Sequence, residues 1–210
     1  MMLYLFEHFG VAVGAISGVL AASGKRIDLF GVTVLALVTA LGGGTVRDLA
    51  LRTPPVFWIH DANYVVTGVA TAVVMFIIAR RWVMPAKMLA VADAFVLALF
   101  TMLGTSKALA HQAGNINAIL LGVITGVAGG IVRDVLVGEI PLVFRSGTYL
   151  YATAATCGAV VFVLLEAWQP GGLQNFVAGT VVTLALRLAS IRWRITLPVF
   201  QGERPVDPSP

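Results

Sequence analysis

The sequence carries the same short motif twice. Gly-Gly-Thr-Val-Arg-Asp occupies residues 43–48 and Gly-Gly-Ile-Val-Arg-Asp occupies residues 129–134, 86 positions further on, each towards the end of a long apolar segment. Glycine weakens a helix by roughly 1 kcal/mol relative to alanine. A charged side chain near the depth of the hydrocarbon is costly and by default indicates function. The repeated motif therefore predicts a duplication within a membrane protein, with two symmetrically placed weak points.

Composition places the chain in the same class. Hydrophobic residues make up 59% of the 210 residues, charged residues only 11%, and the mean hydropathy is +0.93. Soluble proteins carry about a quarter charged residues. We therefore expect an integral membrane protein, with the lipid bilayer as its first partner. The predicted organisation is a single membrane domain over residues 1–197 and a disordered cytoplasmic tail over residues 198–210.

Seven apolar runs are each long enough to cross a bilayer as a helix. A membrane barrel would instead show short segments of alternating polarity. All four tryptophans and all four tyrosines fall at or just outside the edges of the runs, where amphipathic rings prefer the headgroup region. The fold class is thus predicted to be all-α, with seven transmembrane helices. The runs cover roughly residues 4–23, 29–50, 63–79, 86–106, 115–137, 147–167 and 173–190.

The basic residues predict an orientation. Arg47, Arg52 and Lys107 fall on one side of the predicted membrane, and the other 11 of the 14 Lys and Arg residues fall on the opposite side with the C-terminus. Cytoplasmic loops carry the excess of positive charge. We therefore expect the C-terminus in the cytoplasm and the N-terminus outside. The larger set is Lys25, Arg26, Arg80, Arg81, Lys87, Arg133, Arg145, Arg187, Arg192, Arg194 and Arg204.

The duplication extends beyond the motif. A shift of 86 positions also places Glu7 on Asp93 and Pro55 on Pro141. Each unit contains three of the predicted helices, so the second unit must enter the membrane upside down relative to the first. We predict two inverted repeats followed by a seventh helix. Repeat one covers about residues 4–79, repeat two about 86–167, and the seventh helix about 173–190.

The glycines of the motif predict interruptions in the second and fifth spans. Gly42, Gly43 and Gly44 leave the backbone of one span without side chains that would shield it. Gly129 and Gly130 do the same in the other span. Kinking and exposure of backbone groups to an ion become easy there. The alternative is that the glycines only allow close packing, since small residues dominate helix contacts in membranes.

The charges of the motif have two interpretations. The pairs Arg47 with Asp48 and Arg133 with Asp134 either bind each other at a helix end or line a permeation route. Asp93 lies inside the fourth predicted span, where it could face an aqueous entrance or accept a hydrogen bond. Lys107 closes that span and is expected to extend to the outer interface, with a role in a vestibule as the alternative.

Other chemistries have little support in the sequence. His60 and His111 stand alone at loop edges, so no cluster has the spacing of metal ligands. The single Cys157 falls in apolar sequence, far from either histidine, which argues against a nucleophilic enzyme. Neither glycine motif has the pattern of a phosphate-binding loop. We expect no enzymatic activity, no metal or cofactor, and no nucleic-acid partner, because the membrane sidedness of the basic residues accounts for the net charge of +4.

The tandem segments GGGTVRD and AGGIVRD, each followed by a proline six or seven positions beyond the aspartate, resemble those of bacterial members of the trimeric intracellular cation (TRIC) channel family. The resemblance extends from the first helix to about Trp193. It implies a homotrimer in a bacterial or archaeal plasma membrane, with a pore in each protomer that conducts potassium above other monovalent cations. The glycines at 42–44, 129 and 130 would be kink positions bounding the pore. The arginines and aspartates of both motifs, with Asp93 and Lys107, would line or gate it.

Two other functions stay open on the residues alone. Inverted repeats with broken helices also suit a secondary transporter of a small metabolite such as an amino acid, and a non-conducting structural membrane protein is the third class. For a cation channel, Arg47 and Arg133 would repel the permeant ion unless Asp48 and Asp134 neutralise them. We therefore expect the arginines to gate or support the pore rather than bind the ion.

Overall fold

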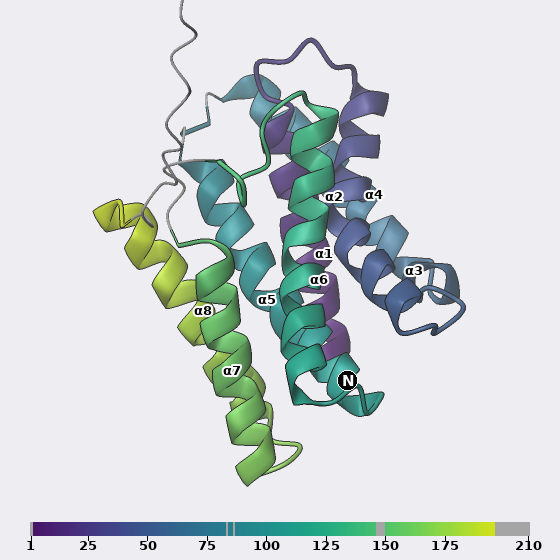
Figure 1. Cartoon of the computed structure of the whole chain (residues 1–210). Helices are drawn as coiled ribbons and strands as arrows, with labels where there is room; N and C mark the ends of the chain where they lie inside the picture. The colour runs from purple at the N-terminus through teal and green to yellow at the C-terminus, as the bar shows by residue number, and fades with distance from the viewer. Residues whose placement is uncertain (1, 83, 86, 146–149, 196–210) are drawn as a thin grey trace, which may run out of the picture.

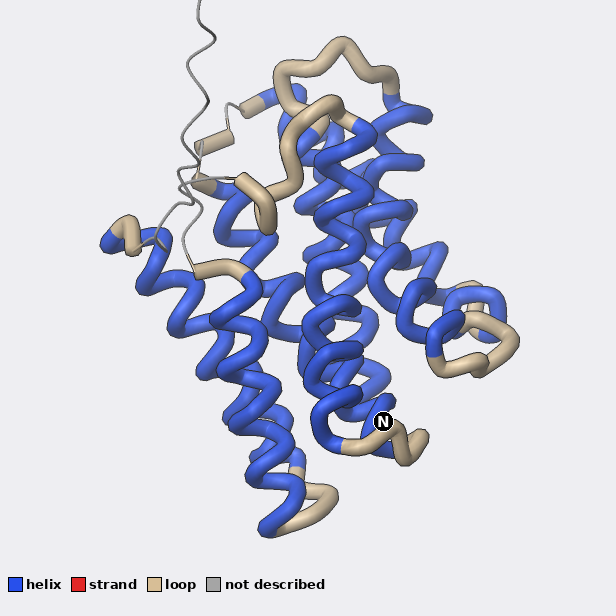
Figure 2. The backbone as a smooth tube through the Cα atoms, in the orientation of Figure 1, coloured by secondary structure: helices blue, strands red, loops and turns tan. Residues whose placement is uncertain are grey.

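The computed structural model describes residues 2–82, 84–85, 87–145 and 150–195, so the predicted tail over residues 198–210 lies outside the described residues. The secondary structure of these ranges is helical, without strands (Figure 2). Their helices are α1 (Met2–Ala21), α2 (Leu29–Ala50), α3 (Phe57–His60), α4 (Asn63–Arg81), α5 (Met88–Ala110), α6 (Asn115–Leu136), α7 (Ala152–Trp168) and α8 (Leu173–Trp193).

The long helices form one bundle (Figure 1). Helix α5 lies at its centre and contacts α1, α6, α7 and α8, and a larger share of it is buried than of the other long apolar helices. Helix α2 packs against α1, α4 and α6. Helices α7 and α8 lie side by side at one edge. The pair α2 and α6, which carry the two motifs, therefore lies inside the bundle with neighbours on several sides.

Six of these helices are long and apolar enough to cross a membrane, namely α1, α2, α4, α5, α6 and α8. The seventh predicted span, 147–167, corresponds to α7, which starts only at residue 152 and is a shorter apolar helix of 17 residues. The predicted bounds of the other spans agree within a few residues, whereas the short α3 was not predicted. The chain is an integral membrane protein, and the seven-span count and the inverted repeats stay predictions.

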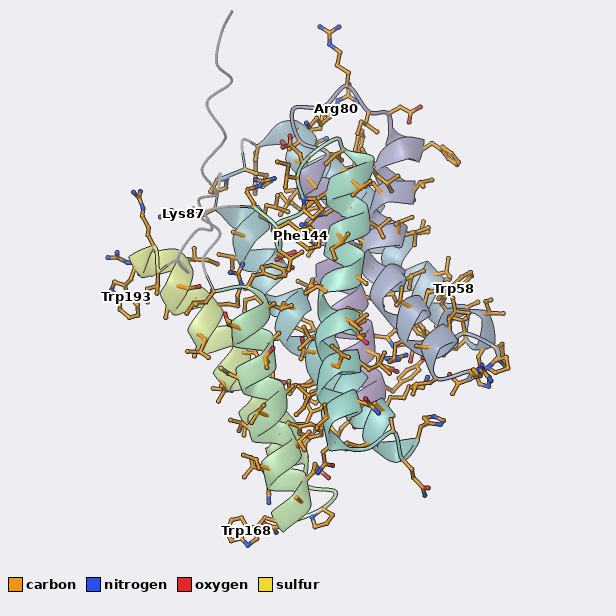
Figure 3. The ribbon with its side chains drawn as sticks, in the orientation of Figure 1. Trp58, Arg80, Lys87, Phe144, Trp168 and Trp193 are labelled. Carbon is orange, nitrogen blue, oxygen red and sulfur yellow. The ribbon has the colours of Figure 1, made fainter. Side chains whose placement is uncertain are left out.

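Side chains at the ends of the bundle agree only in part with the predicted aromatic belts. Trp82, Trp168 and Trp193 are strongly exposed, and Trp168 lies at the opposite end of the bundle from Arg80 (Figure 3). The prediction is wrong for Tyr64 and Tyr151, which are 4% and 6% exposed. The Tyr64 hydroxyl binds Glu7, and the Tyr151 ring packs against Arg187, as described below.

Helices α2 and α6 run as continuous α-helix through their glycines, so neither is interrupted there, and a kink at these residues stays a prediction. The glycines instead bring the two backbones together. A Cβ atom on Gly43 would overlap the carbonyl oxygen of Thr125, and one on Gly129 would overlap that of Thr39. At Gly42 a Cβ atom would stay 3.5 Å from the nearest atom, an ordinary contact. The glycines thus form the crossing point of α2 and α6.

The crossing also fixes the relative direction of the two helices. Gly43 meets Thr125, whereas the earlier Thr39 of α2 meets the later Gly129 of α6. The two helices are therefore antiparallel at their contact. Each motif arginine lies four residues beyond its glycine, about 6 Å along its own helix axis. The two arginine-aspartate pairs consequently lie on opposite sides of the crossing.

Candidate functional site

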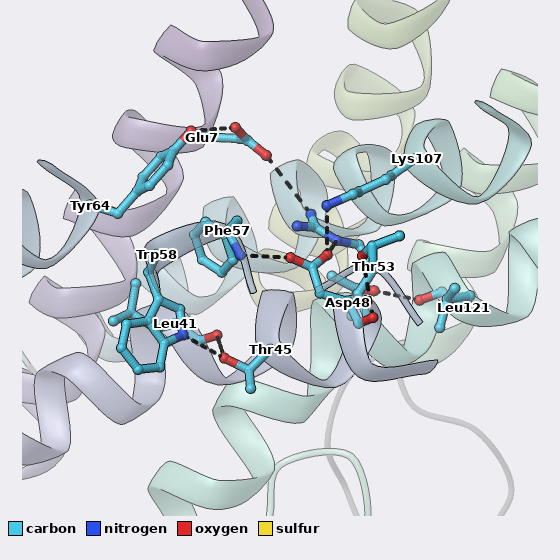
Figure 4. Close-up of polar contacts among 12 residues, drawn as sticks. Glu7, Leu41, Thr45, Asp48, Thr53, Phe57, Trp58, Tyr64, Lys107 and Leu121 are labelled. Atoms are coloured by element: carbon cyan, nitrogen blue, oxygen red, sulfur yellow. Dashed lines mark hydrogen bonds and ion pairs between the residues drawn. The ribbon is translucent and has the colours of Figure 1, made fainter. Parts of the chain in front are cut away.

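A first charged cluster lies at the end of α2. Arg47 and Asp48 are each 1% exposed. The Arg47 Nε donates to Asp48 Oδ1 at 2.7 Å, so the two residues bind each other. The other oxygen, Asp48 Oδ2, accepts from the backbone N–H of Phe57 at 2.9 Å, which fixes the start of α3 against the end of α2 (Figure 4). The Arg47 guanidinium lies 5.5 Å from the centre of the Phe57 ring.

Lys107 joins this cluster from α5. Its Nζ donates to Asp48 Oδ1 at 2.8 Å, and its side chain is only 30% exposed (Figure 4). Lys107 therefore binds a carboxylate of a neighbouring helix, and its extension to the outer interface stays a prediction. The buried Asp48 carboxylate of α2 lies close to α5, and its charge-assisted hydrogen bond to the Lys107 ammonium group is stronger than a contact with a lipid headgroup. Because 59 residues separate Lys107 from Asp48, the sequence spacing gave no sign of this contact.

Glu7 of α1 completes what we term the first cluster, which consists of Glu7, Arg47, Asp48, Tyr64 and Lys107. The Tyr64 hydroxyl donates to Glu7 Oε2 at 2.6 Å. Glu7 Oε1 lies 3.9 Å from Arg47 Nη1, a longer ion pair without a hydrogen bond. The first cluster thus connects α1, α2, α4 and α5 through charged or hydroxyl groups.

A second cluster lies at the end of α6. Arg133 Nε donates to Asp134 Oδ1 at 2.8 Å, and Arg133 Nη1 donates to Asp93 Oδ1 at 2.9 Å. The same Nη1 donates to the hydroxyl of Ser17 in α1. Asp134 Oδ2 accepts from the backbone N–H of Leu142 at 2.9 Å. Asp93, the intramembrane carboxylate picked out in the sequence, therefore binds the motif arginine directly.

Arg187 and Tyr151 also belong to the second cluster, which consists of Ser17, Asp93, Arg133, Asp134, Tyr151 and Arg187. The Arg187 guanidinium lies 4.6 Å from the centre of the Tyr151 ring, and the residue is 2% exposed. Arg187, which the sequence analysis grouped with the cytoplasmic charges, is thus buried in the bundle, and its side of the membrane stays a prediction. The missed signal was its position inside the last apolar run, several residues before the run ends.

The two clusters match at three positions. Glu7 corresponds to Asp93, and the arginine-aspartate pairs correspond to each other, under the shift of 86 residues. In both, the aspartate binds its neighbouring arginine and a backbone N–H just beyond the helix end. They differ in their additional members: Lys107 contributes only to the first cluster, and Ser17 and Arg187 only to the second.

Some buried polar atoms in these clusters have no hydrogen-bond partner within the described part of the chain. Among them are Arg47 Nη2, Arg133 Nη2 and Asp93 Oδ2. Burying a charged group without full hydrogen bonding is costly. The two arginines share the same unpaired atom, so the two halves have the same incomplete polar interior. Such positions suit bound water or a permeating species more than a dry structural core.

Neither cluster has the composition of a metal site. Within the described ranges, no group of three or more His, Cys, Asp or Glu residues could hold a metal ion. The arginines and Lys107 instead neutralise the carboxylates. The expected lack of a resident metal, cofactor or enzymatic activity stays a prediction.

Similarity to known proteins places the chain in a family. The TRIC trimeric intracellular cation channel orthologue from Rhodobacter sphaeroides is 38% identical, with 91% of this chain and 98% of that chain covered and a TM-score of 0.86. This chain belongs to the TRIC channel family. A second TRIC cation channel structure, solved to explain conductance, is 31% identical over 97% of this chain and all of that chain, also with a TM-score of 0.86.

Curated relatives and a family model agree with the TRIC assignment. The UPF0126 inner membrane protein YadS of Escherichia coli (strain K12) is 46% identical, with 95% of this chain and 97% of that protein covered. A UPF0126 membrane protein of Vibrio cholerae is 45% identical over 95% of this chain and 83% of that protein. A family model described as glycine transporter matches residues 4–80 and again 90–167. Each of these two matches covers one of the two repeats predicted for this chain.

Proposed function

We propose that this protein is a channel for monovalent cations, potassium above all, with a pore in each protomer that follows α2 and α6. The observation that carries the proposal is the position of the two charged clusters, on opposite sides of the contact between these helices. The likeness to TRIC cation channel structures supports it. In this proposal the chain forms a homotrimer in a bacterial plasma membrane, with its N-terminus outside.

The contacts suggest how such a pore is held closed. The backbones of α2 and α6 touch at Gly43 and Gly129, so an ion passing along these helices requires them to separate or bend there. The paired carboxylates neutralise Arg47 and Arg133, which removes the repulsion that a bare arginine would exert on a cation. The arginines accordingly act as supports or gates. Two inverted repeats, followed by α8, would give both ends of the pore the same construction.

Recordings from the purified protein in planar lipid bilayers test the channel. Unitary potassium currents are the expected result. Arg133→Ala should change open probability more than the preference for potassium over sodium, because the arginine ties α6 to Asp93 rather than facing the ion. Arg145→Ala, in an exposed loop, is the matched control. Altered selectivity with unchanged gating would contradict the role of Arg133, and the double variant R133A with Asp93→Asn provides the test if the single variant does not fold.

A secondary transporter of a small amino acid is the second candidate, and the family model described as glycine transporter favours it. Liposomes containing the protein separate the two candidates. Saturable uptake of labelled glycine, without unitary currents in bilayers, would identify a transporter. Currents without glycine uptake would identify a channel. If neither signal appears in protein that retains its fold, a structural role would replace both.

A further inference from the structure

A cavity opens beside the first cluster. It has a volume of about 470 Å³ and lies between α1, the segment from α2 to α4, and α5. Small-molecule sites commonly fall between about 300 and 1,000 Å³. Its lining includes two tyrosines, two carboxylates and one lysine, and we term it the tyrosine cavity. These residues are Tyr4, Glu7, Asp61, Tyr64 and Lys107.

The charges around the tyrosine cavity do not balance. Glu7, Asp48 and Asp61 supply three carboxylates, whereas Arg47 and Lys107 supply two cations. Counting only these carboxylates and these Lys and Arg side chains, one negative charge is in excess. Of these three carboxylates, Asp61 is the one without an ion-pair partner in the described ranges of the chain. The second cluster, by contrast, contains two carboxylates and two arginines.

The unpaired carboxylate is held ionised and in place. Asp61 Oδ1 accepts from the backbone N–H of Asn63 at 2.9 Å, and Oδ2 accepts from the Tyr4 hydroxyl at 2.9 Å. These two hydrogen bonds lower the pKa of the Asp61 carboxyl below its ordinary value. Because each carboxylate oxygen has a second lone pair, Asp61 can still accept from a ligand.

Aromatic rings form the other part of this wall. The centres of the Tyr4 and Tyr64 rings lie 5.7 Å apart, and the His8 ring lies 4.2 Å from Tyr4 and 4.3 Å from Tyr64. Both tyrosine hydroxyls donate to carboxylates, namely to Asp61 and Glu7. The hydroxyls therefore fix the rings beside the acids. Aromatic faces next to carboxylates are the side-chain set that recognises ammonium groups.

We propose that the tyrosine cavity binds the ammonium group of a small organic cation or zwitterion, with Glu7 and Asp61 as acceptors and Tyr4 and Tyr64 as aromatic walls. The lysine of the cavity lining shows that a carboxylate here binds an ammonium group, since Lys107 Nζ donates to the adjacent Asp48 at 2.8 Å. An external ammonium group neutralises the remaining carboxylate in the same way. This site goes beyond ion conduction and does not depend on it.

Calorimetric titration of the purified full-length protein with methylammonium chloride tests the site. The titration is done at about pH 8, where unperturbed histidines are neutral, and sodium chloride keeps ionic strength constant. We expect saturable binding by the unmodified protein, weakened at least about tenfold, or about 1.4 kcal/mol, by Asp61→Asn. Tyr4→Leu should weaken binding similarly, whereas Tyr4→Phe, which keeps the ring, should weaken it less. Glu139→Gln removes an exposed carboxylate in the α6–α7 loop and serves as the matched control.

Three ligands then distinguish the source of the ammonium group. Glycine binding with acetate inactive assigns an amino acid, and binding only to vesicles that contain phosphatidylethanolamine assigns a lipid headgroup. Methylammonium binding without either assigns a free amine. Equal heats from methylammonium and from potassium chloride, or unchanged binding in both D61N and Y4L, would overturn the proposal. Tyr4 is 40% exposed, so Y4L should fold even if D61N does not.

Discussion

Arg133 shows how this membrane interior tolerates a charge. Its guanidinium binds Asp134, Asp93 and Ser17, so the arginine joins α1, α5 and α6. Removing one partner of a buried ion pair costs about 3–5 kcal/mol, because the other charge stays buried and unpaired. We expect Arg133→Ala to lower the free energy of unfolding by that amount, measured by chemical unfolding in detergent.

The loss of stability in R133A should be smaller when the Asp93 charge, which the variant leaves unpaired, is also removed. Asp93→Asn in the R133A background is expected to restore part of the lost stability, since the amide needs no counter-charge. Arg145, which is exposed, should cost less than about 1 kcal/mol when changed to alanine. A double variant no more stable than R133A would show that Asp93 is not the partner that matters.

Lys107 allows a test of the proposed pore beside the first cluster. It is the lysine that lines the tyrosine cavity and binds Asp48. Lys107→Met should raise single-channel potassium conductance about twofold in about 0.01 M KCl, where the Debye length is about 30 Å. In about 1 M KCl, where that length is about 3 Å, the increase should vanish. Lys25→Met, in the loop between α1 and α2, is the control, and a salt-independent effect would exclude an electrostatic origin.

At the residue scale, the sequence offered pairing of adjacent charges as one of two interpretations, and it gave no sign of the contacts between distant residues. Arg47 with Asp48 and Arg133 with Asp134 could be paired because adjacent opposite charges near hydrocarbon must neutralise each other. The contact of Lys107 with Asp48 depends on how α5 packs beside α2. Tyr64 and Tyr151 were placed at the membrane interface because ring type and span edge agree with it, and only the helix packing shows that both are buried.

At the scale of the helices, the contact of α2 with α6 can be tested by adjacent glycines. Gly43→Ala places a methyl group against the carbonyl of Thr125, whereas Gly42→Ala meets only an ordinary contact. We expect G43A to lower stability by about 1–3 kcal/mol, the typical cost of overpacking. G42A should be neutral or stabilising by up to about 1 kcal/mol. Thermal unfolding, monitored by tryptophan fluorescence, compares the stabilities of G43A and G42A.

The internal repeat predicts the same effect at the corresponding glycine of α6. Gly129→Ala should be as harmful as G43A, because its methyl group would meet the carbonyl of Thr39 in the corresponding geometry. Equal stability of all three glycine variants would mean that the helices can separate at the crossing without cost. The sequence located this glycine pair and gave two interpretations of it, breaks in the helices and close packing, of which the breaks were favoured. Helix continuity could not be predicted, since glycine permits both a bend and a close approach.

At the scale of the whole molecule, the hydrophobic runs predicted most of the long helices because length and polarity alone decide which segments enter a bilayer. The same argument could not predict α3, whose four residues are fixed by the bond between Phe57 and Asp48. Nor could it fix the start of α7, which has the shortest apolar stretch. The two sides of the membrane are assigned only by the distribution of basic residues, so orientation needs its own experiment.

Site-directed labelling with a membrane-impermeant maleimide in intact cells tests that orientation. Cys157, an exposed residue of α7, is first changed to alanine to remove the native thiol. His111→Cys, at the end of α5, should then be labelled from outside, and Ser23→Cys, at the end of α1, only after the cells are broken open. Both positions are exposed, so burial does not explain a difference in labelling.

The reverse labelling pattern would place the tyrosine cavity on the cytoplasmic side, since Lys107 lies one helical turn from His111. Labelling of both positions from outside would show that the chain inserts in two orientations.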